Sequence, residues 1–99
     1  MAAVKLLELL PAALAEAEEA AVWYAERDPR VAARFAEELE AALNRAGDAP
    51  HRWPISLHGT HRVRLTRFPC LVVYREDAIR ILVVAIAHEK RKPGYWRKR

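Results

Sequence analysis

The sequence has little cysteine, and this excludes a fold stabilised by internal disulfides. Cys70 is the single cysteine in 99 residues, so it has no partner within the chain. This usage fits a reducing compartment, and we expect a cytoplasmic protein. We interpret Cys70 as a small buried apolar residue and not as a catalytic thiol.

Long apolar runs are also missing. The longest unbroken one, residues 81–87, has seven residues, whereas a helix needs about 20 to cross a bilayer. The apolar N-terminal residues are interrupted by Lys5 and Glu8. They lack the charged start and the cleavage site of a secretory signal. We therefore expect a soluble protein with no membrane segment.

Glycine is scarce, and Gly47, Gly59 and Gly94 stand far apart. This spacing excludes a glycine-rich phosphate loop. The best pair of metal-ligand residues, His58 and His61, lies in an irregular segment without a third ligand at regular spacing. The sequence therefore predicts neither a metal site nor another cofactor.

The composition that is present belongs to a globular protein, with 53% hydrophobic and 30% charged residues. The length leaves room for one domain, which we assign to residues 1–99. Charge is unevenly divided. Residues 1–49 carry five basic and ten acidic side chains, whereas residues 50–99 carry twelve basic and three acidic ones. The asymmetry fits either a polyanionic partner for the basic half or a solvated surface with charge pairing inside the molecule.

The first half predicts a short strand over Val4 to Leu10, followed by a helical hairpin. Pro11 suits the first turn of a helix, where its missing N–H has no partner to lose. Asp28 and Pro29 have the residue types of an N-cap and of a first helical position. Two apolar stripes at helical spacing support the two helices. They are Leu14, Ala17, Ala21 and Tyr24, then Val31, Phe35, Leu39, Ala42 and Ala46, with Gly47 as the C-terminal stop. We interpret Trp23 and Tyr24 as core residues.

The second half predicts strands after a proline-containing loop at 48–59. Apolar and polar residues alternate over 62–66, as in a half-buried strand. A turn at Phe68-Pro69 precedes a strand over 71–74, and a tight turn follows at Glu76-Asp77. Residues 79–87 are nearly all apolar, which predicts a strand buried on both faces. The fold class is therefore α+β, with the N-terminal strand and the helical hairpin packed on an antiparallel sheet and a basic tail at 88–99.

At this point the order of several short segments is recognisable. They are Glu19 to Tyr24, Arg34-Phe35, Glu38-Leu39, Arg67-Phe68-Pro69, Val72 to Arg75, Val84 to His88, and then Arg91, Pro93, Gly94, Tyr95 and Trp96. In this order the sequence resembles the RelE/ParE superfamily of toxins from bacterial type II toxin–antitoxin modules. It is most similar to the ParE-like branch, often described as plasmid stabilisation proteins.

The resemblance implies a growth-inhibiting toxin that a cognate antitoxin neutralises in a hetero-oligomer. ParE-like members inhibit DNA gyrase, and RelE-like members cleave mRNA on the ribosome. We favour gyrase inhibition and keep two alternatives, a ribosome-dependent, metal-independent endoribonuclease and a degenerate non-toxic member that still binds an antitoxin. The antitoxin should be acidic and partly disordered, laying an amphipathic segment across the helical hairpin.

If the protein is a nuclease, the expected catalytic residues are Arg62, Arg64, His88, Arg91 and Tyr95. Arg62 and Arg64 lie two apart on a strand, so both face the same way and suit phosphate binding. His88 titrates near neutrality by residue type. Against this reading, Leu71 stands where RelE-like enzymes carry a further arginine. The two arginines also fit an ordinary solvent-exposed strand face, and His88 a backbone contact at a strand end.

If the protein inhibits gyrase, the same basic region becomes a binding surface. We assign Arg67, Arg75, Trp96 and Arg97 to it. The alternative for Tyr95 and Trp96 is a hydrophobic lid that folds back on the sheet.

Overall fold

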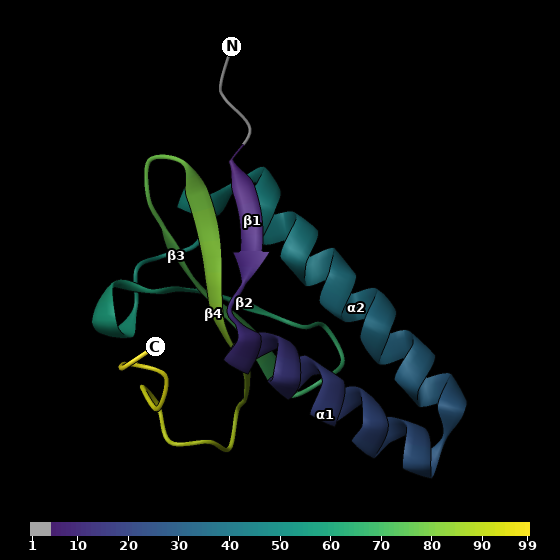
Figure 1. Ribbon diagram of the computed structural model, residues 1–99. Helices are drawn as coiled ribbons and strands as arrows, with labels where there is room; N and C mark the ends of the chain where they lie inside the picture. The colour runs from purple at the N-terminus through teal and green to yellow at the C-terminus, as the bar shows by residue number, and fades with distance from the viewer. Residues whose placement is uncertain (1–4) are drawn as a thin grey trace.

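Two helices dominate the first half of the computed structural model, which describes residues 5–99. They are α1 (Pro11–Arg27) and α2 (Pro29–Asp48), and each begins at the predicted proline. Asp28 alone separates them, and its Oδ1 accepts the N–H of Arg30 at 2.9 Å. This side chain caps α2 by pairing one of the N–H groups that a helix leaves free at its start. The predicted hairpin is confirmed, and its helices diverge as a V (Figure 1).

The end of α2 differs from the prediction. The helix runs through Gly47 to Asp48, so Gly47 is not its stop. Gly47 is not among the glycines with positive φ, which are Gly59 and Gly94. Pro50 opens the short turn η1 (Pro50–Arg52) directly afterwards. Because proline has no N–H to donate, this residue ends the helix instead.

The strands of the described chain form one sheet in the order β1-β4-β3-β2. Their bounds are β1 (Leu6–Leu9), β2 (His61–Arg64), β3 (Cys70–Glu76) and β4 (Arg80–His88). The three later strands are antiparallel, as predicted, but β1 pairs with β4 in parallel, so the sheet is mixed. The long path from β1 to β4 through both helices permits a parallel pairing, which no tight turn allows. Val4, where we expected the first strand to begin, lies outside the described residues.

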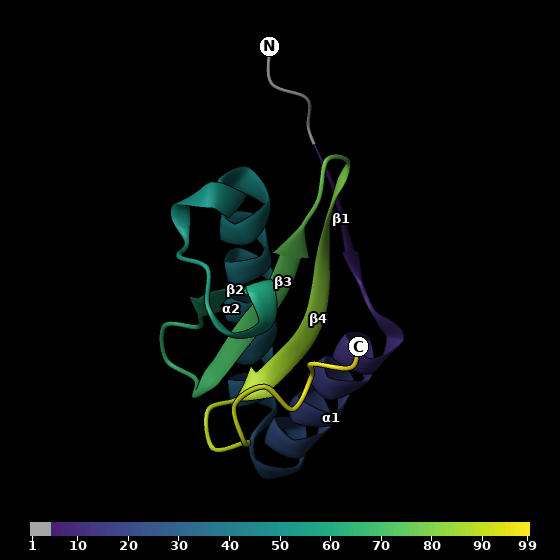
Figure 2. The ribbon, with the colours of Figure 1, turned by 90° about the vertical axis from the view of Figure 1, so that its left-hand side faces the viewer.

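The two helices cover one face of the sheet, and we call the opposite one the outer face (Figure 2). Phe35 of α2 packs with Val72, Val83 and other buried residues of the helix-covered face. On the outer face, Trp96 of the tail packs with a second apolar group, Val73, Val84, Ala85 and Ala87. This explains why β4 is buried on both sides, as its sequence predicted. No helix in residues 5–99 combines the length and the apolar character needed to cross a membrane.

The pairing of β3 with β4 contains one irregularity. Val73 pairs with Ala85 but Tyr74 pairs with Val83, so Val84 is an extra residue on β4. Such a β-bulge changes which backbone groups a strand turns toward each neighbour. The bulge lies directly before the part of β4 that carries the candidate site.

The tail requires a glycine at position 94, where φ is +80°. A Cβ added there would lie 2.9 Å from Nε2 of His58, whereas one added at Gly59, with φ +70°, would meet nothing within 4 Å. Positive φ costs an L-residue about 1–2 kcal/mol.

We expect both Gly59→Ala and Gly94→Ala to lower the free energy of unfolding, and Gly94→Ala to lower it more. Adding His58→Ala to Gly94→Ala should remove the difference. Chemical denaturation of the variants measures this. Equal losses in the two single variants would show that His58 does not confine the tail.

Candidate functional site

The outer face carries a hollow of about 490 Å³, where β3 begins and β4 ends. We call it the outer hollow. All the catalytic candidates from the sequence line it, namely Arg62, Arg64, His88, Arg91 and Tyr95. The two arginines project from β2 and the other residues lie at or beyond the end of β4. The structure therefore brings together residues that are up to 33 positions apart in the sequence.

Apolar side chains occupy the middle of this face. In the sheet register Arg64 lies opposite Leu71, and Leu71 lies opposite Ala87. In the next row Arg62 lies opposite Val73, which lies opposite Ala85. Leu71 thus occupies the centre of a row that an arginine would otherwise make basic. The site is an apolar strip with cations on its borders.

Arg64 is engaged within the protein. Its Nε donates to the carboxylate of Glu89, and its Nη1 donates to the carbonyl of Leu65 at 3.3 Å. The backbone N–H of Glu89 is held by the carbonyl of Pro69 at 2.8 Å. Because Glu89 pairs with this guanidinium, part of the positive charge that Arg64 brings to the hollow is offset within the protein. In contrast, the exposed side chain of Arg62 has no hydrogen-bond or ion-pair partner within residues 5–99.

Tyr95 is also engaged. Its hydroxyl donates to Oε2 of Glu16 at 2.5 Å, across the tail to α1. Burial first, and then the hydrogen bond to Glu16 and the charge of Glu16, raise the pKa of Tyr95 above its ordinary value. The guanidinium of Arg91 lies over the tyrosine ring, 4.0 Å from its centroid. Tyr95 therefore stays protonated at neutral pH and its hydroxyl points away from the outer hollow.

His88 ends β4 and is exposed. Its Nδ1 accepts the N–H of Lys90 at 3.1 Å, so the ring nitrogen left for another contact is Nε2. This is the backbone contact that we considered as an alternative role. The assignment of Nδ1 as acceptor fixes the proton of a neutral ring on Nε2.

The predicted binding residues do not form one cluster. Arg67 lies beside α2, where its N–H donates to Glu38 at 2.7 Å. Arg75 donates to the carbonyl of Arg99 at 3.1 Å, and Arg97 is exposed on the tail. Trp96 is only 3% exposed, which favours the alternative of a hydrophobic lid on the sheet.

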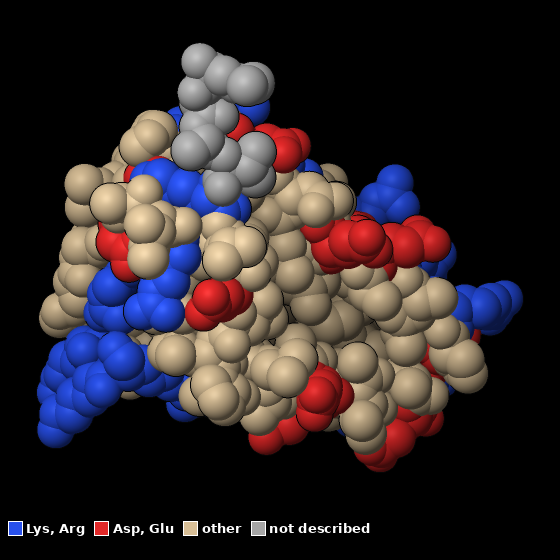
Figure 3. Space-filling model, turned by 45° about the horizontal axis from the view of Figure 1, so that its top comes forward, with Lys and Arg blue, Asp and Glu red and all other residues tan. Residues whose placement is uncertain are grey.

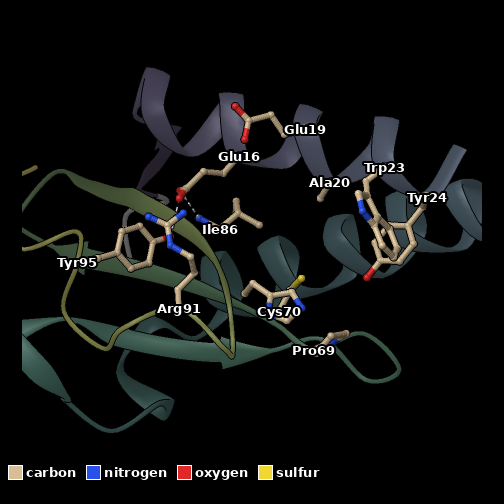
Figure 4. A pocket seen from close by; sticks show the side chains of 11 residues that line it. Glu16, Glu19, Ala20, Trp23, Tyr24, Pro69, Cys70, Ile86, Arg91 and Tyr95 are labelled. Carbon is tan, nitrogen blue, oxygen red and sulfur yellow. Dashed lines mark hydrogen bonds between the residues drawn. The ribbon is translucent and has the colours of Figure 1, made fainter. Parts of the chain in front are cut away.

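A second hollow, of about 540 Å³, lies between α1 and the sheet (Figure 4). We call it the helix-side hollow. Its lining is mainly apolar and includes Trp23 and Ile86. Trp23 is 51% exposed, so its assignment to the core was wrong. His88, Arg91 and Tyr95 line both hollows and form a wall between them.

Glu16 was not predicted from the sequence, yet its side chain bonds to three residues, Ile86, Tyr95 and Arg99. Glu16 lies on the buried stripe of α1, three residues after Ala13 and four before Ala20. An acidic residue on an otherwise apolar stripe was the signal that could have found it, because a carboxylate placed there requires partners. Figure 4 shows it reaching Tyr95 and the backbone of Ile86.

The histidines are engaged separately. Nδ1 of His51 lies 3.0 Å from Glu76, and His61 stacks on Tyr74 with ring centroids 5.1 Å apart. Among residues 5–99, no group of three or more His, Cys, Asp or Glu side chains is placed to hold a metal ion.

Charge is segregated over the surface as well as along the sequence. In Figure 3 most acidic groups lie to the right and below, on the side of the helices. The largest basic patch of that view lies at the lower left, on the side where the tail lies in Figure 1. The outer hollow is thus bordered by the basic part of the molecule.

A family model described as the ParE toxin of the type II toxin–antitoxin system, parDE, matches residues 7–93. The chain belongs to this ParE toxin family. Among solved structures, it is similar to a chain of the chromosomal ParDE toxin–antitoxin system from P. aeruginosa, with a TM-score of 0.75 and 16% sequence identity over 86% of this chain and 96% of that one. At this identity the likeness concerns the fold. No curated protein matches the sequence significantly.

The raised pKa values of two tyrosines in this ParE-family protein predict a loss of stability at alkaline pH. Burial and the nearby Glu76 raise the pKa of Tyr74 to about 12, from an ordinary 10.0. The pKa of Tyr95 is raised as well. The folded state therefore holds these protons more tightly than the unfolded state, so their stabilisation is complete below pH 10 and is lost as the pH rises above it.

We expect the free energy of unfolding to fall between about pH 10 and about pH 12, and to fall less steeply in Tyr95→Phe. Denaturant titrations at several pH values measure the slope. An unchanged slope in Tyr95→Phe would contradict the raised pKa of Tyr95.

Proposed function

We propose that this ParE-family toxin inhibits DNA gyrase by binding it through the outer hollow and the basic tail. The observation that carries the proposal is the engagement of Arg64 by Glu89 and of Tyr95 by Glu16. These two side chains would otherwise be the phosphate-binding and proton-transfer groups of a nuclease. Membership of the ParE family supports the same conclusion, since gyrase inhibition is the activity that the family implies.

The chemical requirements of RNA cleavage explain why the engagement of these two side chains argues against a nuclease. Attack by a 2′-hydroxyl needs a group that takes its proton, a donor for the leaving oxygen, and positive charge on the phosphate. In the outer hollow one guanidinium is paired with a carboxylate, and the tyrosine hydroxyl already donates to another. Leu71 lies beside Arg64 in the sheet register, in place of a third cation.

The same geometry suits the recognition of a protein surface. An apolar strip with exposed arginines on its borders can bury a complementary strip and pair acidic groups at its rim. Arginine is among the residues that most often dominate the energetics of such interfaces. Arg62 and Arg91 are exposed arginines of this hollow, one on β2 and the other beyond the end of β4.

A second candidate, the ribosome-dependent endoribonuclease, is favoured by one observation. The outer hollow does gather Arg62, His88 and Arg91, and His88 keeps Nε2 for another contact. A rearrangement that released Tyr95 from Glu16 would complete the set.

Purified protein distinguishes the two. We expect it to inhibit supercoiling by gyrase and to leave a reporter mRNA intact on translating ribosomes. The double variant Arg62→Ala/Arg91→Ala should raise the concentration for half-inhibition about tenfold or more. Arg34→Ala, which removes an exposed arginine from α2, is the matched control and should change it less than about twofold. Cleaved mRNA together with unaffected supercoiling would establish the nuclease instead.

The family implies a cognate antitoxin, and we propose that it covers the helix-side hollow. Trp23, which lines this hollow, is 51% exposed and its neighbour Val22 is 57% exposed, so the two leave adjacent apolar surface uncovered on α1. Because α1 itself carries several glutamates, the apolar part of the antitoxin should lie on α1. Its acidic part should lie toward Arg91 and the tail.

Trp23→Ala should weaken antitoxin binding on the order of thirtyfold, because a large aromatic side chain at an interface is a typical hot spot. Calorimetry or surface plasmon resonance with the purified antitoxin measures this. Glu40→Ala, on the exposed face of α2, is the control. Equal affinity of the two variants would place the antitoxin elsewhere.

A further inference from the structure

The half of β4 that ends at His88 has an edge that no strand within residues 5–99 covers. β1 pairs only with residues from Arg80 to Val83, and its last bond joins the N–H of Leu10 to the carbonyl of Val83. Pro11 then turns the chain into α1. Beyond the bulge at Val84, backbone groups of β4 on that edge need other partners, because a buried unpaired group is costly.

Side chains provide these partners. Oε1 of Glu16 accepts the N–H of Ile86 at 3.2 Å, and Nη1 of Arg99 donates to the carbonyl of Val84 at 3.1 Å. Glu16 and Arg99 also pair with each other at 2.7 Å. A glutamate from α1 and an arginine from the tail thus take the place that a longer β1 would have filled.

The same carboxylate holds the tail at a second point through the hydroxyl of Tyr95. Its side chain is only 12% exposed, so these bonds form in a partly dry environment where they are strong. The backbone of Arg99 is held in addition by Arg75. One buried carboxylate therefore joins α1, β4 and both ends of the segment from Tyr95 to Arg99.

The tail needs such a connection because of its charge. Residues 88–99 contain six lysines and arginines and one glutamate. Beyond β4, their backbone-to-backbone hydrogen bonds are short turns within the tail, apart from the bond of Glu89 to Pro69. Like charges repel one another, and a chain without ladder bonds to the sheet has little to fix its path. The packing of Trp96 fixes one side chain, whereas Glu16 fixes the direction of the segment on both sides of it.

We propose that Glu16 is a positioning residue of the target-binding surface. By holding Tyr95 and Arg99 it keeps the tail on the path that places Arg91 beside the outer hollow. This inference rests on the proposed function, because the surface that Glu16 positions is the one proposed to bind gyrase. Glu16 acts through the tail and does not itself contact the target.

The test compares Glu16→Gln with Glu18→Gln, which makes the same change on an exposed position of α1 two residues away. Hydrogen exchange measures how firmly Glu16 holds the tail, and it does so without any target. In Glu16→Gln we expect exchange of the Ile86 amide and of residues 95–99 to accelerate about tenfold or more, while the centre of β3 stays protected. Glu18→Gln should match the unmodified protein. Unchanged exchange in Glu16→Gln would overturn the inference.

Gyrase supercoiling provides the second readout. The half-inhibiting concentration should rise about tenfold for Glu16→Gln and for Arg99→Gln, and the double variant should be no worse than either single one, because both remove the same link. Faster exchange with unchanged inhibition would show that the tail's path does not matter for the target.

The two proposals fail in different ways. If the unmodified protein does not inhibit gyrase, the proposed function is wrong, and the exchange data still decide whether Glu16 holds the tail. If the unmodified protein inhibits gyrase and the variants inhibit it equally well, the positioning role is wrong and the proposed function stands. Arg99→Gln removes the other partner of this ion pair and leaves α1 unchanged, so it keeps the test valid if Glu16→Gln does not fold.

Discussion

The structure depends on the early end of β1. Because Pro11 begins a helix directly after Leu10, β1 covers only half of β4, and the other half must be completed by side chains. Glu16 can do so because it lies on the first turns of the helix that replaces the strand. Its charge then requires a cation, which Arg99 of the tail supplies. The position of α1, the path of the tail and the division between the two hollows all follow from this arrangement.

The sequence predicted those parts of the fold that depend on local chemistry. Pro11, Asp28 and Pro29 determine where the helices begin through their own backbone restrictions and hydrogen bonds. The alternation over β2 and the apolar run of β4 similarly reflect what each strand faces. Gly47 was misread because glycine permits a helix to end but does not force it, whereas Pro50 does.

The parts that could not be predicted depend on residues far apart in the sequence. The parallel pairing of β1 is decided by the path of the whole chain, and a four-residue strand has no local sign of its partner. Glu16 and Arg99 are 83 positions apart, and Arg64 and Glu89 are 25 apart. The structure places the five candidate catalytic residues around one hollow, but the partners that determine their chemistry could not be predicted from the sequence. Trp23 was assigned to the core because it borders the apolar stripe, but the stripe that α1 buries passes through Ala20 and Tyr24 and leaves Trp23 at the rim.

The two hollows share the side chains that separate them. His88, Arg91 and Tyr95 line both, so a partner on either side contacts the same side chains. Arg91 lies on the ring of Tyr95, and the hydroxyl of Tyr95 is bound to Glu16 on the helix side. A carboxylate that approached Arg91 from the helix side would compete with the tyrosine ring for the guanidinium and would stand near Glu16, whose negative charge repels it. From the outer side the same guanidinium is reached without passing a carboxylate of α1. Since Glu89 of the outer hollow is already paired with Arg64, the outer side is the better approach to Arg91 for an acidic group, including the acidic part of the proposed antitoxin, whose apolar part lies on the helix side.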